Sequence, residues 1–328
     1  MAAAAPIETR AAPAARAAIA VPGLIFGVLA ALPLAGLVMP ANYLLDFGTR
    51  IMIFAIAAVA LDLIVGYGAL VSFGHAAFIG LGAYAVGILA AHGIGEVLVS
   101  LPTALAAAIL FALATGAVSL RTRGVYFIMI TLAFGQMAFF TASSLAPYGG
   151  DDGLTIAARN TLLGLPIFKY PSVLYYIVLA ALAGTFFLCR AIVASRFGRV
   201  LRGAKENPTR MATLGFEIYR FQLVAYAISG GLCGLAGFLL ANANDFVSPA
   251  YMSWQRSGEL IIMVLLGGIG TLYGAIIGAA SYLLIEEFLS RVTEYWQVIF
   301  GPFLVLVVLF GRGGLVGVFA QLTGKRRG

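Results

Sequence analysis

Few side chains that could take part in chemistry lie inside the long apolar segments of this chain. The ionisable and amide residues within them are Asp62, His75, Gln136 and Glu259. An ionisable group in hydrocarbon is costly, so such residues usually face the interior of a helix bundle. His75, with Ser72 and Thr131, is a candidate for the lining of a transport pathway. The alternative is that His75 hydrogen-bonds the backbone of a broken helix.

The other two charged residues each have two interpretations. Asp62 is expected to pair with a polar group on a neighbouring segment, and a place in the pathway is the alternative. Glu259 begins an apolar segment near one membrane face, where it either contributes to a gate or lies in water.

Motifs that would indicate catalysis are incomplete. The stretch closest to a GxSxG nucleophile elbow is LVSFG at 70–74, which lacks the first glycine. A P-loop needs Ser or Thr after its Gly-Lys pair, whereas Gly324-Lys325 is followed by Arg326. Cys189 and Cys233 lie in or beside apolar segments and indicate neither a disulfide framework nor a metal cluster. We therefore expect no enzyme activity, no metal and no cofactor.

The composition places these residues in a lipid bilayer. Apolar residues make up 62% of the chain and charged residues 10%, and the mean hydropathy is +1.02. A helix of roughly 20 apolar residues crosses the hydrocarbon core. The apolar runs are continuous and rich in Ala, Leu and Gly, which excludes a membrane barrel with its alternating strands. The expected fold is an all-α polytopic membrane protein with about ten transmembrane helices, some of them broken at glycines.

Charge decides how the predicted spans are divided and oriented. Hydropathy places them near 19–39, 51–67, 75–92, 98–120, 124–145, 172–193, 219–242, 257–270, 273–290 and 296–311. A single tilted span over 257–290 would move the basic C-terminal tail outside, against the preference of Lys- and Arg-rich loops for the cytoplasm. Ten spans keep both termini and most of the basic residues cytoplasmic. The net charge of +7 follows these loops, so nucleic-acid binding is not indicated.

This division gives one transmembrane domain with a tail on each side. Residues 1–18 are expected to be a disordered cytoplasmic tail, 19–311 the transmembrane domain, and 312–328 a basic cytoplasmic tail. The first apolar run extends to Met39, too long for the core of a secretory signal.

Glycines interrupt two apolar segments, VSFGHAAFIGLGAYA and LLGGIGTLYGAIIGA. Paired broken helices in two halves of a chain indicate a central pathway, whereas single glycines more often let helices pack closely. The halves, about 51–145 and 172–311, are a candidate repeat. The pathway candidates are Ser72, Gly74, His75, Thr131, Gln136, Gly267, Gly268, Gly270 and Thr271.

A basic, polar loop at 195–218 separates two groups of spans and is predicted to be cytoplasmic. Asn207 is predicted to cap a short helix, with Pro208 as its first residue and Gly215 as its stop. Met211 and Leu214 are expected to be exposed on it beside basic residues. Such a surface fits a groove on another protein, and an amphipathic helix lying on the membrane surface is the alternative.

Four stretches in order resemble the inner-membrane permeases of branched-chain amino acid ABC transporters, of the LivM and LivH kind. They are GYGALVSFGHAAFIGLGAYA at 66–85, RTRGVYFIMITLAFGQM at 121–137, GRVLRGAKENPTRMATLGFEIYRFQLVAYAISGGLCGLAGFL at 198–239 and LLGGIGTLYGAIIGA at 265–279. The resemblance implies a multi-pass permease subunit of an ATP-driven importer in the bacterial inner membrane. It also implies two cytoplasmic ATP-binding subunits, a second homologous permease and a periplasmic substrate-binding protein as partners.

The loop resembles the family's coupling helix, which docks into the ATPase. The residues expected to dock are Arg202, Lys205, Glu206, Asn207, Pro208, Arg210, Met211, Leu214 and Gly215. Asn207-Pro208-Thr209 departs from the small residues that many ABC importers carry after the glutamate. Branched-chain amino acids are the substrate implied by the resemblance. The alternatives are an ABC permease for urea or short amides, and an ion-coupled secondary transporter of small organic solutes.

Overall fold

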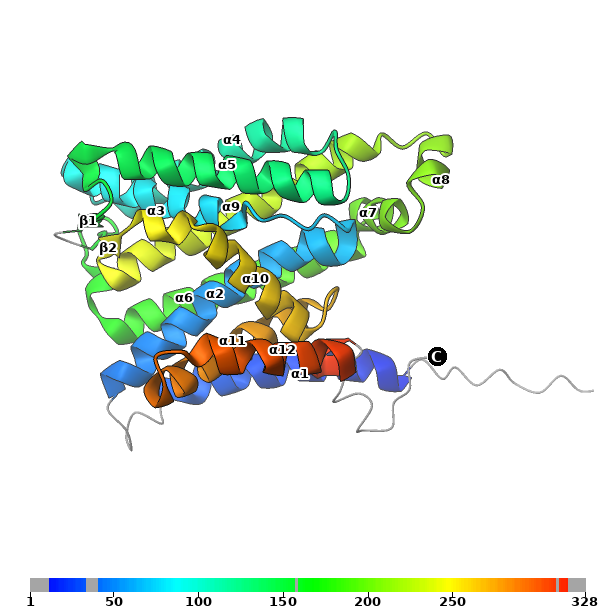
Figure 1. The fold of residues 1–328 in the computed structure, drawn as a ribbon. Helices are drawn as coiled ribbons and strands as arrows, with labels where there is room; N and C mark the ends of the chain where they lie inside the picture. The colour runs from blue at the N-terminus through cyan, green and yellow to red at the C-terminus, as the bar shows by residue number, and fades with distance from the viewer. Residues whose placement is uncertain (1–11, 34–40, 157–158, 311–312, 318–328) are drawn as a thin grey trace, which may run out of the picture.

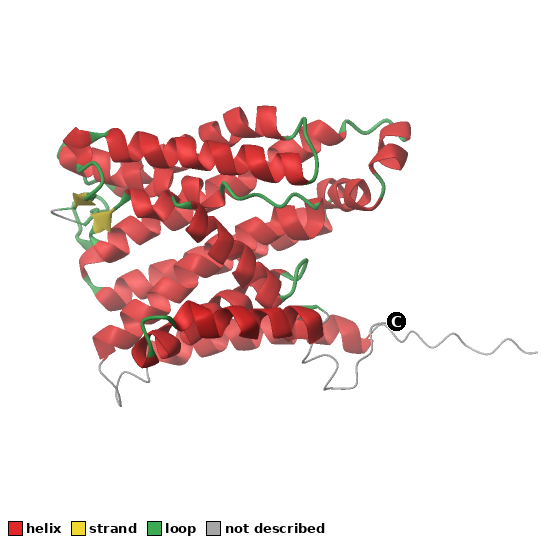
Figure 2. Ribbon diagram, viewed as in Figure 1, coloured by secondary structure: helices red, strands yellow, loops and turns green. Residues whose placement is uncertain are grey.

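The computed structural model describes residues 12–33, 41–156, 159–310 and 313–317, and for 12–20, 41–42 and 308–310 it describes the backbone alone. These residues are almost entirely helical (Figure 1, Figure 2). In chain order the elements are α1 (Ala12–Ala31), α2 (Ala41–Gly68), α3 (His75–Ala91), α4 (Val97–Ser119), α5 (Val125–Ser144), η2 (Ala146–Tyr148), β1 (Leu154–Thr155), η3 (Ile167–Lys169), α6 (Pro171–Ala194), α7 (Arg196–Glu206), α8 (Pro208–Thr213), α9 (Ile218–Asn244), β2 (Phe246–Val247), η4 (Pro249–Met252), α10 (Trp254–Gly267), α11 (Leu272–Val292) and α12 (Trp296–Phe310).

The helices confirm the polytopic all-α class. Each predicted span overlaps one helix, and six of the described helices are long and apolar enough to cross a membrane: α2, α4, α5, α6, α9 and α11. Three apolar helical segments are shorter, namely α3, the Val21–Ala31 part of α1 and the Trp296–Val307 part of α12. With its 14 residues, α10 is also too short to cross alone. Six of the described helices are therefore candidate crossings by length and composition, and ten remains a prediction.

Two predicted boundaries differ from the structure. The helix α2 begins at Ala41 and not at 51. Its first turns carry polar side chains that have partners: Thr49 Oγ1 donates to Leu45 O at 2.7 Å, and Arg50 pairs with Glu286 at 3.5 Å. The helix α1 begins at Ala12, before the expected start at 19. Residues 1–11, 312 and 318–328 of the two predicted tails lie outside the described residues.

The centre of the bundle is α2, which lies among α6, α9, α10 and α11 (Figure 1). All of its residues from 51 to 65 are buried. A helix that is apolar all round is stable only with neighbours on every side. Small residues bring the surrounding helices close: Gly230 and Gly234 of α9 lie against Ala112 and Ala108 of α4.

The two ends of the bundle differ in character. The helices α7 and α8 project from one end, and β1 and β2 pair at the opposite end (Figure 1). Between them α9 runs for 27 residues, which is about 40 Å. The basic loop and the long connection at 145–170 therefore lie at opposite ends.

Candidate functional site

The first helix break is the non-helical segment 69–74 between α2 and α3. Side chains from other helices accept hydrogen bonds from its backbone and from the start of α3. Phe73 N donates to Thr131 Oγ1 of α5 at 3.2 Å, and Ala76 N donates to Ser257 Oγ of α10 at 3.1 Å. These bonds satisfy N–H groups that a helix start leaves free. The structure thus brings the region of Ser72 and Gly74 into contact with Thr131.

His75 is the first residue of α3 and is completely buried. Its Nε2 lies 3.0 Å from Ser229 Oγ, and that hydroxyl donates to Ala60 O at 2.6 Å. Because the serine has a single proton, which goes to Ala60, the imidazole Nε2 is the donor in the first bond. The rings of Phe78 and Tyr226 lie edge-to-face against it. In this conformation His75 therefore connects α3 with α9 and α2, and its place in a pathway stays a prediction.

Gln136 lies half-buried on α5. No side chain within the described ranges hydrogen-bonds to it. Its neighbour Gly135 faces the Gly74 backbone, so this turn of α5 packs directly on the first break.

The second break separates α10 from α11, as the glycines predict. Gly268 and Gly270 have φ of +115° and +76°, a region that glycine enters without strain. Thr271 Oγ1 donates to Gly268 O at 2.6 Å and closes the turn. Gly267 packs against the backbone of α11.

Asp62 holds the second break against α2. Its carboxylate accepts a hydrogen bond from Gly270 N at 2.7 Å, and Tyr67 donates from its hydroxyl to Gly270 O at 2.8 Å. Asp62 is completely buried. A buried partner for Asp62 on a neighbouring segment was predicted, and this partner is a backbone N–H exposed by the break. The close fit depends on Gly66, where a Cβ would lie 2.6 Å from Gly270 N.

The basic loop contains the predicted short helix. Asn207 caps α8 by accepting a hydrogen bond from Arg210 N at 2.9 Å, Pro208 is its first residue, and Gly215 follows with φ of +86°. The preceding helix α7 was not predicted. Its sequence signal is a serine cap, since Ser195 accepts from Gly198 N at 3.3 Å ahead of apolar residues at helical spacing.

Exposure within the loop differs from the prediction at Met211. We expected this side chain to be exposed, but it is half-buried because it packs on Gly203 of α7. The contact is close: a Cβ added at Gly203 would lie 2.7 Å from the Met211 sulfur. Leu214 is 63% exposed, as expected, and Phe216 is 39% exposed. Met211 therefore fastens α8 to α7, and Leu214 with Phe216 forms the exposed apolar surface.

Two basic side chains of the loop turn toward other helices. Lys205 Nζ donates to Gly66 O at 2.7 Å, close to the end of α2. Arg202 donates to Val193 O of α6 at 3.1 Å. A cation bonded to the last carbonyl groups of a helix is favoured by the helix dipole. Among the basic residues predicted to dock, Arg210 is exposed and makes no side-chain hydrogen bond to the described residues.

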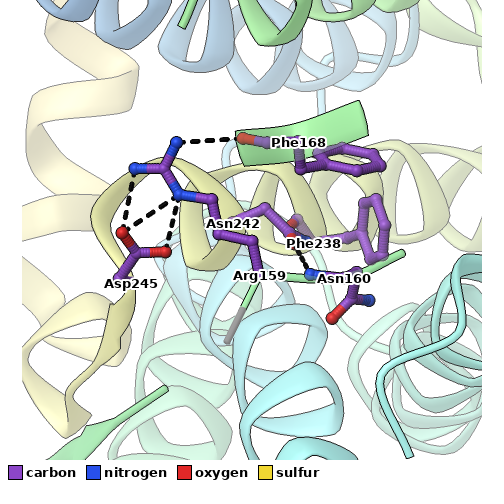
Figure 3. Close-up of polar contacts among 6 residues, drawn as sticks. All are labelled: Arg159, Asn160, Phe168, Phe238, Asn242 and Asp245. Atoms are coloured by element: carbon purple, nitrogen blue, oxygen red, sulfur yellow. Dashed lines mark hydrogen bonds and ion pairs between the residues drawn. The ribbon is translucent and has the colours of Figure 1, made fainter. Parts of the chain in front are cut away.

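A polar cluster closes the opposite end (Figure 3). Arg159 donates to both carboxylate oxygens of Asp245, at 2.8 and 2.9 Å, and to Phe168 O at 2.9 Å. The bond to Asp245 raises the pKa of the Arg159 guanidinium above its ordinary value. Asn160 N donates to Asn242 Oδ1 at 3.1 Å. The cluster fixes the connection at 145–170 on the end of α9. No sequence motif marks Arg159 or Asp245.

Comparison with known proteins finds relatives over most of the chain. The family described as "Branched-chain amino acid transport system / permease component" matches residues 43–309. The high-affinity branched-chain amino acid transport system permease protein LivM of Escherichia coli (strain K12) is 29% identical, over 83% of this chain and 69% of the relative. LivH of the same organism is 31% identical over 42% of this chain and 44% of its own. The autoinducer 2 import system permease protein LsrC of Enterobacter sp. (strain 638) is 29% identical over 89% and 84%.

No solved structure matches the chain significantly. The family and the apolar helices indicate a multi-pass protein of the inner membrane, and the family is one of transport permeases and not of catalytic enzymes. With a match that extends from the start of α2 to the end of α12, the chain belongs to the family of permease components of branched-chain amino acid transport systems.

Proposed function

We propose that this chain is one of two permease subunits of an ATP-driven importer, and that it forms the translocation pathway for branched-chain or related amino acids. Two ATP-binding subunits hydrolyse ATP on the cytoplasmic side, and a periplasmic binding protein delivers the substrate. The names of the similar proteins support the substrate class, since LivM and LivH are permeases for branched-chain amino acids. The helices α7 and α8 project from one end of the bundle, and this observation supports the coupling of transport to ATP hydrolysis.

The surface of α8 is suited to docking. Leu214 and Phe216 are exposed apolar residues, and Arg210 adds an exposed positive charge. An apolar anchor with a charge beside it is a common way for a short helix to occupy a groove. Met211 holds α8 on α7, so a force on α8 passes to α7.

A chain of contacts leads from the docking surface to the second break. Lys205 of α7 bonds the end of α2 at Gly66, and Asp62 one turn earlier bonds Gly270. Both contacts are 2.7 Å long and partly buried. Closely packed elements shift as units, so a displacement of α7 moves the end of α2 and the second break together.

Both breaks adjoin α2 and supply the proposed pathway. The first contributes Ser72, Gly74, His75, Thr131 and Gln136, and the second contributes Gly267, Gly268, Gly270 and Thr271. Irregular backbone at membrane depth is tolerated where it is covered by protein or lines a cavity. Most of these residues are covered in the conformation described here, so the proposal requires that the helices separate during transport.

Co-purification and inhibition test the proposal. The tagged protein in mild detergent should bring along ATP-binding subunits, and leucine uptake by cells carrying the whole system should stop with vanadate. Uptake that an ionophore abolishes and vanadate leaves intact would instead indicate an ion-coupled secondary transporter. Uptake of urea or acetamide in place of leucine would indicate an ABC permease for short amides.

Orientation is tested separately. Reporter fusions within the loop at 195–218 and at both termini should report the cytoplasm. A periplasmic signal from the loop would contradict docking of α8 to an ATPase.

A further inference from the structure

A small cavity lined by polar and apolar residues lies away from the end of the bundle that carries α7 and α8. It encloses about 190 Å³ between α2, α3, α9, η4 and α10. Its position follows from α2: Arg50 in the lining precedes Gly66 by sixteen residues, or about 24 Å along the helix. Asn244, the last residue of α9, also lines it. The cavity therefore lies toward the end that carries β1 and β2, where a substrate from outside would arrive.

Two arginines line the cavity, Arg50 and Arg256, and each has an acidic partner. Arg50 pairs with Glu286 at 3.5 Å, and Arg256 pairs with Glu259 at 2.6 Å. The local charge is thus balanced. A ligand with a net charge would leave one charge uncompensated in a partly buried site, which is costly. A zwitterion adds no net charge.

The guanidinium groups have donors left for a ligand. Each arginine has five N–H donors in a planar fork that suits a carboxylate. The ion pair with Glu259 engages a single nitrogen of Arg256, and the long contact to Glu286 leaves most of Arg50 free. The Arg256 guanidinium also lies 5.9 Å from the centre of the Phe54 ring, which holds it at the cavity.

An acceptor and an apolar wall complete the lining. Asn244 Nδ2 donates to the Tyr251 hydroxyl at 3.0 Å, and no donor among the described residues reaches its amide oxygen. Ile79, Leu240 and Leu260 are buried apolar residues of the wall. Pockets for drug-sized ligands measure roughly 300–1,000 Å³, so this cavity suits a smaller solute.

We propose that this cavity is an outer binding subsite for an α-amino acid zwitterion with an apolar side chain. The carboxylate binds Arg50 and Arg256, the ammonium group binds the amide oxygen of Asn244, and the side chain packs on Leu240 and Leu260. The proposal rests on the proposed function and adds the residues that select the substrate. Urea and short amides have no carboxylate, so they do not use the two arginines.

Direct binding tests the subsite. The complete importer is purified in detergent without its binding protein, and equilibrium binding of radiolabelled leucine is measured up to millimolar concentrations. Arg256→Gln should weaken binding by roughly tenfold or more, as expected for loss of a charge-assisted hydrogen bond. Leucinamide, which lacks the carboxylate, and isocaproate, which lacks the amine, should displace leucine poorly.

Two variants control for structure. Arg220→Gln removes an arginine from a more exposed (i,i+3) pair with Glu217 near the start of α9, and it should leave binding unchanged. The double variant Arg256→Gln with Glu259→Gln leaves no unpaired charge, so it should restore any loss of folding but not leucine binding. Wild-type affinity in the double variant, or equal displacement by leucinamide, would overturn the proposal. So would an importer that transports leucine but binds none without the binding protein. A wild-type complex without ATP-dependent leucine uptake would instead contradict the proposed function.

Discussion

Gly66→Ala tests the contact between α2 and the second break. A Cβ at this position would lie 2.5 Å from Asp62 Oδ1, 2.6 Å from Gly270 N and 2.7 Å from Gly270 Cα. Two of these atoms are backbone and the third is a completely buried carboxylate, so none can move aside cheaply. Overpacking of this kind costs about 1–3 kcal/mol. At about 1.4 kcal/mol per tenfold, the conformation in which Gly270 contacts Asp62 becomes roughly fivefold to a hundredfold less populated.

The expected result is loss of coupling with the protein still in the membrane. ATP hydrolysis and leucine uptake are measured together in proteoliposomes that contain the whole importer, and the number of leucines carried per ATP should fall at least about fivefold. Gly68→Ala is the matched control, because a Cβ there would meet Leu201 and Leu70 at ordinary distances of 3.6 and 3.7 Å. Both changes replace a glycine of α2 with alanine, which has the higher helix propensity. An unchanged ratio in Gly66→Ala, or equal damage in Gly68→Ala, would refute the reasoning.

Three further predictions concern single contacts. Asp62→Ala leaves Gly270 N without its acceptor and should lower the free energy of unfolding by about 1–3 kcal/mol. Asp62→Asn retains an oxygen acceptor and should lower it less. Equal losses in a thermal unfolding assay would contradict the assignment. Leu214→Glu should weaken co-purification of the ATP-binding subunits without changing the amount of permease in the membrane, since Leu214 is exposed and supports no core. Arg159→Gln should cost about 1 kcal/mol, because its pair with Asp245 is partly exposed, and it should speed proteolysis within 145–170; an unchanged digestion pattern would show that the ion pair does not hold this connection.

Capping rules that involve residues a few positions apart were sufficient to predict α8, the short helix of the basic loop. Asn207, Pro208 and Gly215 lie at the cap, the first position and the stop, as side-chain capping and backbone preference require. The burial of Met211 could not be read in the same way, since its partner surface is Gly203 on another helix. Capping depends on residues a few positions apart, whereas burial depends on how helices meet.

Pairs distant in the sequence explain the other differences. The start of α2 was placed too late because Arg50 is polar, and its partner Glu286 belongs to α11. Hydropathy indicated that Asp62 needs a partner, but Gly270 lies 208 residues away and offers only its backbone. The sequence therefore predicts that a buried ionisable side chain needs a partner, but it does not identify the group that supplies it.

The burial of α2 along its length connects the two proposed sites. Residues 51–65 are enclosed by neighbouring helices, and the described part of the helix contains no proline. Bending it locally would require repacking a dense core, so a shift imposed at Gly66 must also move Arg50, about 24 Å away. Gly66→Ala should therefore change leucine affinity at the outer cavity, although it touches none of the lining. Leucine binding to Gly66→Ala with the wild-type dissociation constant would mean that α2 does not move as a unit, and that the cavity and the second break respond to ATP by separate routes.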